Sequence, residues 1–103
     1  MASPTAVAIR VDRGLHALLT EVRALAGTAE EWDTLSDDER AAIALDWDHL
    51  LADYLTKLER LYRSGEMTAE QQGRYRDLLQ ELRGALPIFD HLGLLPLPIP
   101  PTG

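Results

Sequence analysis

The chain has 103 residues, a formal net charge of -7 and no cysteine. Its length suits a single domain, and the lack of Cys excludes disulfides, thiolate zinc sites, cysteine-bound iron–sulfur clusters and cysteine nucleophiles. The negative charge repels nucleic-acid phosphates and anionic lipids, so we expect no nucleic-acid partner and no membrane partner.

The sequence also lacks the usual markers of export and of catalysis. No apolar run approaches the roughly 20 residues that cross a bilayer, and the first ten residues lack the basic and then apolar pattern of a secretory signal. It contains no phosphate-binding Gly-rich loop, paired metal-binding histidines on a helix or calcium-loop spacing. We therefore expect a cytoplasmic protein that is not an enzyme and needs no cofactor.

A helix is predicted over residues 4–26. Ser3 suits the N-cap position and Pro4 the first helical position, while Gly27 is a typical helix stop. The apolar residues recur at spacings of three and four and share one helix face. They are Val7, Val11, Leu15, Leu18, Leu19, Val22 and Leu25.

A short helix is predicted over residues 29–35. Thr28 and Glu31 have the spacing of a capping box, in which each side chain binds the other residue's backbone N–H. Trp32 follows, and we expect its ring to enter the core.

A long helix is predicted over residues 37–64. Ser36 and Glu39 form a second capping-box pattern, and Gly65 suits the left-handed conformation that ends a helix. Apolar and aromatic residues fall on one face of this helix. They are Ile43, Ala44, Trp47, Leu50, Leu51, Tyr54, Leu55, Leu58, Leu61 and Tyr62.

A third capping-box pattern, Thr68 with Gln71, opens a helix predicted over residues 69–86, and Pro87 ends it. Because the link at 65–67 is short, this helix and the preceding one should form an antiparallel hairpin.

The final segment, 87–103, contains five prolines but is strongly apolar. Each Pro fixes its own φ and disfavours helix at the residue before it, so we expect an extended tail. The predicted fold is therefore all-α, a three-helix bundle over 1–86 with an extra helical turn between its first two helices, followed by this tail.

The helix over 37–64 is longer than its two predicted neighbours, which leaves part of its apolar face without a cover. Either the tail folds back on its own bundle, or two chains pair along this helix as a homodimer and share tails. We expect the dimer, while a tail that docks on another protein stays open. The residues expected at such contacts are Trp47, Leu51, Tyr54, Leu58, Phe89, Leu92, Leu95, Leu97 and Ile99.

Asp46, His49, Asp53 and Lys57 are predicted to form a polar ridge on the outer face of the same helix. A carboxylate three residues before a histidine resembles the ligand pairs of di-iron helical bundles. Those bundles point their ligands inward, whereas this ridge lies outside the apolar face. A solvated charge ladder is the preferred interpretation, and a metal enzyme using Asp46, His49 and Asp53 is the alternative.

These features predict a small acidic interaction, adaptor or regulatory protein. It should self-associate and contact protein partners through the tail or an acidic helix face. An acidic inhibitor that binds a basic nucleic-acid-binding protein is a second possibility, since such binding depends on charge and would weaken with salt.

Overall fold

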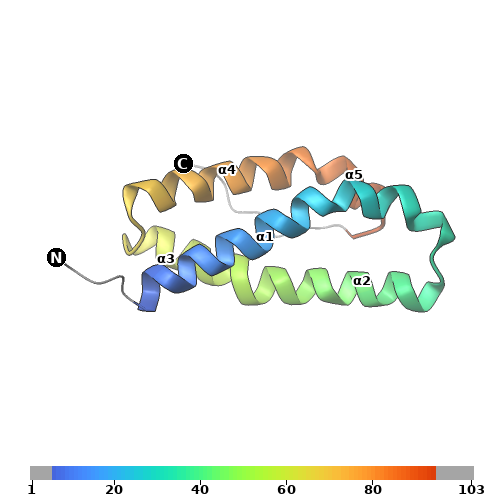
Figure 1. Ribbon diagram of the computed structural model, residues 1–103, viewed down its shortest axis with the longest axis horizontal. Helices are drawn as coiled ribbons and strands as arrows, with labels where there is room; N and C mark the ends of the chain where they lie inside the picture. The colour runs from blue at the N-terminus through green and yellow to red at the C-terminus, as the bar shows by residue number, and fades with distance from the viewer. Residues whose placement is uncertain (1–5, 95–103) are drawn as a thin grey trace.

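The computed structural model describes residues 6–94 (Figure 1). Within these residues every regular element is helical, which confirms the all-α prediction. The molecule is an elongated bundle of 52 × 25 × 19 Å, in which the first helix crosses in front of the others. None of the helices described is both long and apolar enough to span a bilayer.

The first helix, α1, runs over Ala6–Glu31 and is longer than predicted. It passes through Gly27, where a Cβ would have nothing within 4 Å, and a glycine inside a helix costs only about 1 kcal/mol relative to Ala. The Thr28 hydroxyl donates to the Ala24 carbonyl at 3.4 Å within the helix, so it does not cap a new one. The helix predicted over 29–35 is therefore wrong, and only a 3₁₀ turn, Trp32–Thr34, follows α1.

Trp32 is half-buried rather than enclosed. The Arg40 guanidinium lies over its ring, 5.6 Å from the centroid, and Arg40 Nε donates to the Trp32 carbonyl at 2.9 Å. This contact fastens the connection between α1 and the next helix.

The second rod consists of α2, Asp37–Leu50, a π-helical turn, Leu51–Leu55, and α3, Thr56–Arg63. The capping box at its start is confirmed, with Ser36 and Glu39 joined by bonds of 3.1 and 3.2 Å. At its end Gly65 has a φ of 80°, as predicted for a left-handed stop.

The π turn is absent from the sequence prediction and changes which side chains face inward. The Thr56 N–H bonds the Leu51 carbonyl five residues back, which widens the turn. Leu51 and Leu55 both remain buried, while Tyr54 is 38% exposed. Tyr54, predicted on the apolar face and at a partner contact, is therefore not part of the core.

The hairpin continues into α4, Ala69–Gly84, and then α5, Leu86–His91. The capping box between Thr68 and Gln71 is confirmed, with both bonds at 3.1 Å. As predicted, α4 returns antiparallel to α3 (Figure 1).

The segment after Pro87 begins as a helix, so an extended tail from this residue is wrong for residues 87–91. Pro87 lies in the first turn of α5, where its missing N–H costs no helical bond. The helix inserts Phe89, which is fully buried, with its ring 4.9 Å from that of Trp47 in an edge-to-face contact. The remaining apolar tail residues, Leu95, Leu97 and Ile99, lie outside the described residues.

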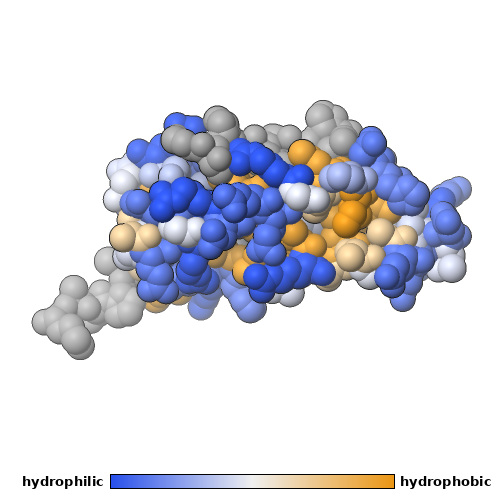
Figure 2. All heavy atoms as spheres, turned by 90° about the horizontal axis from the view of Figure 1, so that it is seen from above, coloured by the Kyte–Doolittle hydropathy of each residue, from blue (hydrophilic) through white to orange (hydrophobic). Residues whose placement is uncertain are grey.

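The core is formed where α1, α4, α5 and the α2–α3 rod meet. Its buried apolar side chains are Val11, Leu15, Leu18, Val22, Leu25, Trp47, Leu51, Leu55, Leu58, Met67, Tyr75, Leu78, Leu79, Leu82, Ala85, Phe89 and Leu92. The face seen in Figure 2 is mostly hydrophilic, with apolar residues gathered toward the end where α5 lies.

Polar contacts hold α4 to both of its neighbours. Gln71, only 5% exposed, donates from Nε2 to Asp12 Oδ1 at 3.0 Å and to the Ala8 carbonyl at 3.2 Å on α1. The hydroxyl of buried Tyr75 donates to Glu59 Oε2 on α3 at 2.5 Å. Burial, followed by this bond to the carboxylate, raises the pKa of Tyr75 well above its ordinary value.

Candidate functional site

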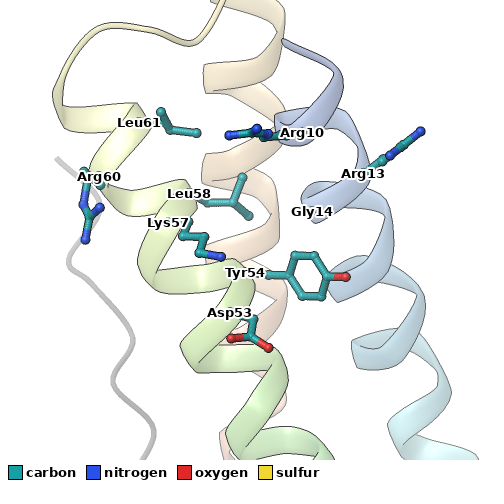
Figure 3. Close-up of a pocket in the computed structure, with 9 residues that line it drawn as sticks. All are labelled: Arg10, Arg13, Gly14, Asp53, Tyr54, Lys57, Leu58, Arg60 and Leu61. Carbon is teal, nitrogen blue, oxygen red and sulfur yellow. The ribbon is translucent and has the colours of Figure 1, made fainter. Parts of the chain in front are cut away.

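A groove of about 520 Å³ separates the N-terminal half of α1 from α3 (Figure 3). We call it the α1–α3 groove. Its lining residues are Arg10, Arg13, Gly14, Asp53, Tyr54, Lys57, Leu58, Arg60 and Leu61.

Four of the ten basic side chains of the chain line this groove. Arg10 from α1 and Lys57 from α3 extend into the space between the helices, while the side chains of Arg13 and Arg60 lie at its margins and point away from it (Figure 3). Arg10 and Arg13 on α1, and Lys57 and Arg60 on α3, are each three residues apart. They place positive charge on both walls of the groove. In a chain of net charge -7 this is a local reversal of sign.

None of these four cationic side chains has a hydrogen bond or ion pair within residues 6–94. The ion pairs found there join Arg23 with Glu81, Arg63 with Glu59 and Arg74 with Asp12. Within residues 6–94 the ion pairs therefore lie outside the groove, and its lining, with four cations and the one carboxylate of Asp53, keeps a net positive charge. Such charges attract anionic groups from outside the chain.

The floor of the groove is apolar. Leu58 is 2% exposed, and a Cβ placed on Gly14 would lie 3.4 Å from its side chain, so α1 and α3 approach closely beneath the charges. Half-buried Leu61 adds apolar surface from α3. The ring of Tyr54 points across toward α1 and closes one end (Figure 3). The groove therefore presents apolar surface between cationic walls.

Beyond Tyr54 lies a second hollow of about 280 Å³, lined by Glu21 from α1 and by Asp46, His49, Leu50, Asp53 and Tyr54. It contains three members of the predicted polar ridge, and the fourth, Lys57, lies in the α1–α3 groove. All four ridge residues are exposed, as predicted. In the described part of the chain, no three His, Asp or Glu side chains are placed to hold a metal ion.

The residues predicted to make contacts with a partner have different positions. Five of them are buried in the chain's own core, namely Trp47, Leu51, Leu58, Phe89 and Leu92. Tyr54 is exposed at the junction of the two hollows. The apolar face of the α2–α3 rod is thus largely covered within one chain, and Leu45 and Tyr54 are its exposed large apolar residues.

Sequence reasoning missed Arg10, Arg13 and Arg60 as site residues. Their spacing marks two cationic pairs on helix surfaces, but it does not show that the pairs face each other. Comparisons with protein-family models, curated proteins and solved structures find no match. Function is therefore inferred from the chemistry of the groove.

Proposed function

We propose that this chain is a small non-catalytic interaction protein of the adaptor or regulatory type. Its α1–α3 groove would bind a protein segment that combines carboxylates with an apolar side chain. The observation that carries this proposal is the set of four unpaired cations around an apolar floor. The lining residues include no Ser, Cys, Thr or His.

The walls suit carboxylates better than a uniform polyanion. Arg10 supplies a planar guanidinium that can bind a carboxylate with two parallel N–H bonds, and Lys57 supplies a compact point charge. Between them, Tyr54 and Leu61 offer surface for one apolar side chain, and tyrosine is enriched among residues that dominate binding energy. Nucleic acid would extend beyond the groove and lie along the acidic remainder of the surface, which repels its phosphates at close range.

The negative charge of the whole chain does not prevent this binding. At physiological salt, exposed charges more than about 8 Å apart are largely screened. An acidic segment inside the groove therefore interacts mainly with the four cations that line it. Its binding should weaken as salt rises, because most of these contacts are exposed.

Fluorescence anisotropy with labelled peptides tests the proposal. A peptide alternating Glu and Leu should bind, whereas matched peptides alternating Glu with Ser, or Lys with Leu, should bind at least about tenfold more weakly. Stronger binding of the Lys and Leu peptide would overturn the proposal and favour the acidic-inhibitor function. Stronger binding of an oligonucleotide would overturn it in favour of a nucleic-acid partner.

The double variant Arg10→Gln with Lys57→Gln locates the binding site. It should reduce affinity for the Glu and Leu peptide by roughly tenfold or more. The control, Arg23→Gln with Arg76→Gln, changes the net charge equally but lies outside the groove lining. Equal losses in both variants would show that affinity follows net charge, and would contradict a site in the groove.

A further inference from the structure

The α1–α3 groove and the second hollow are two halves of one trough. Both lie between α1 and the α2–α3 rod, and they share Asp53 and Tyr54 in their linings. The half on the α3 side of Tyr54 carries the four cations. The other half carries the carboxylates of Glu21 and Asp46, and Asp53 lies at the junction beside Tyr54. The charge of the trough therefore changes sign at Tyr54.

These carboxylates also lack internal partners. Within residues 6–94, no hydrogen bond or ion pair involves the side chains of Glu21, Asp46 or Asp53, just as none involves those of the four cations. Two uncompensated sets of opposite charge thus lie end to end in one trough.

We infer that the groove's partner is a second copy of this chain, bound across the trough with a two-fold axis near Tyr54. A two-fold interface uses the same patch on both subunits, so the patch must complement itself. Rotation by half a turn about Tyr54 places the cationic half of one copy over the acidic half of the other. The four cations of one copy would then face Glu21 and Asp46 of the other, once on each side of the axis.

The π turn supports a role for Tyr54 at this axis. A regular α-helix over 51–55 would turn Tyr54 toward the core, as its sequence spacing predicted. The π-helical bond from Thr56 to Leu51 instead leaves the tyrosine 38% exposed in the trough. Single π turns are frequent at functional sites, and a central tyrosine is a typical anchor of an interface.

The dimensions of the bundle allow such an interface. A stable interface buries roughly 800 Å² on each partner, which is about an eighth of the 6600 Å² exposed by one chain. The trough follows the long axis of a bundle 52 Å long and 25 Å wide. One face of this bundle therefore has enough area, and half-buried Leu50 and Leu61 lie on either side of Tyr54 to add apolar contact.

This inference rests on the proposed function, and light scattering after size exclusion tests it separately. The full chain should have twice its mass of 11.5 kDa at low salt and approach the single mass at high salt. Changing all four cations, Arg10, Arg13, Lys57 and Arg60, to Glu leaves only acidic charges in the trough, and changing Glu21, Asp46 and Asp53 to Lys leaves only basic ones. Each variant alone should be a monomer with the helical circular dichroism of the natural chain.

Mixing the two variants is the decisive step. An acidic trough complements a basic one on both sides of the axis, so the equimolar mixture should recover the dimer mass. Tyr54→Ser should weaken the natural dimer at unchanged charge. A mixture that stays monomeric while each variant is folded would overturn the two-fold trough.

Two other outcomes separate this inference from the proposed function. A natural chain that is monomeric at low salt yet binds the Glu and Leu peptide would overturn the dimer and leave the groove's function intact. A dimer whose mass survives both charge reversals would show that the copies meet elsewhere. A third outcome is that the charge reversals abolish the dimer as expected, but the separated monomers do not bind the peptide. The trough would then serve self-association alone.

Discussion

The two sides of α1 differ in how their polar groups are satisfied. Toward α4, Asp12 accepts from both Gln71 at 3.0 Å and Arg74 at 3.2 Å, so the charge is neutralised where the helices meet. Toward α3, Arg10 faces Lys57 across the groove, and neither side chain has a partner within the described residues. One side is closed by internal contacts, and the other is open.

This difference indicates which polar residues serve the fold and which are available to a partner. Buried polar groups must find internal hydrogen bonds, because leaving one unpaired costs about 1–3 kcal/mol. Gln71 meets this demand with four bonds, two in its capping box and two to α1. Exposed cations carry no such demand, so their concentration in one groove needs a different explanation.

The largest expected effect is on stability, and it comes from comparing a leucine on the α4 side with one on the α3 side. Leu82 on α4 is fully buried, so Leu82→Ala should lower the free energy of unfolding by about 2–5 kcal/mol. Leu61 lines the groove and is half-buried, so Leu61→Ala should cost only about 1 kcal/mol. Urea unfolding measures both. Equal losses would show that the groove side is as closed as the α4 side.

The next effect concerns the amide of Gln71. Gln71→Glu keeps the size and the acceptor for the Thr68 cap, but it replaces the donor that bonds Asp12 and Ala8 with a second carboxylate oxygen. The unfolding free energy at neutral pH should fall by about 1–3 kcal/mol. Gln80→Glu, at an exposed position of the same helix, is the control. Similar losses in the two variants would contradict the specific role of Gln71 between α1 and α4.

Tyr75 gives a smaller effect that depends on pH. Tyr75→Phe keeps the ring and removes the bond to Glu59, which should cost about 1–2 kcal/mol near neutral pH. Because the pKa of Tyr75 is raised in the folded state, its contribution is complete below the unfolded value of about 10 and is lost as pH rises above it.

Urea unfolding at about pH 8 and about pH 11 measures this dependence. The natural chain should lose more stability between these values than Tyr75→Phe does. The control is Tyr62→Phe, since the Tyr62 hydroxyl has only a weak contact of 3.5 Å with Arg76. The same alkaline loss in the natural chain and in Tyr75→Phe would show that Tyr75 is not the group responsible.

Local signals in the sequence predicted the starts of α2 and α4 but not the end of α1. The capping boxes at Ser36 and Thr68 act within four residues, so spacing alone identifies them. Thr28 has the same spacing, but α1 continues through it, because one exposed glycine is too weak a signal to end a helix. A capping-box pattern therefore marks a helix start only where the helix before it has already ended.

The π turn and the groove depend on the packed bundle. Trp47, Leu51 and Leu55 are spaced four residues apart. On a regular helix of about 3.6 residues per turn, side chains at this spacing move gradually around the axis. The wider π turn at 51–55 keeps all three buried. Arg10 and Lys57 come from distant parts of the chain and face each other only after α1 packs on α3. Neither feature has a signal within a short window of sequence. The exposed ridge at Asp46, His49 and Asp53 was predictable because it needs only one helix.

The smallest expected effect on stability is the one that best separates function from folding. Arg10→Gln with Lys57→Gln removes two exposed charges that have no partner among residues 6–94 and repel each other across the groove. The unfolding free energy should stay within about 0.5 kcal/mol of the natural value, with any change toward greater stability. Arg74→Gln, which removes the ion pair with Asp12, should instead be neutral or slightly destabilising.

A loss above about 1 kcal/mol in the unfolding free energy of the groove variant would show that these cations stabilise the fold and are not reserved for recognition. Unchanged or higher stability together with lost peptide binding would show that the chain keeps this charge repulsion for its partner.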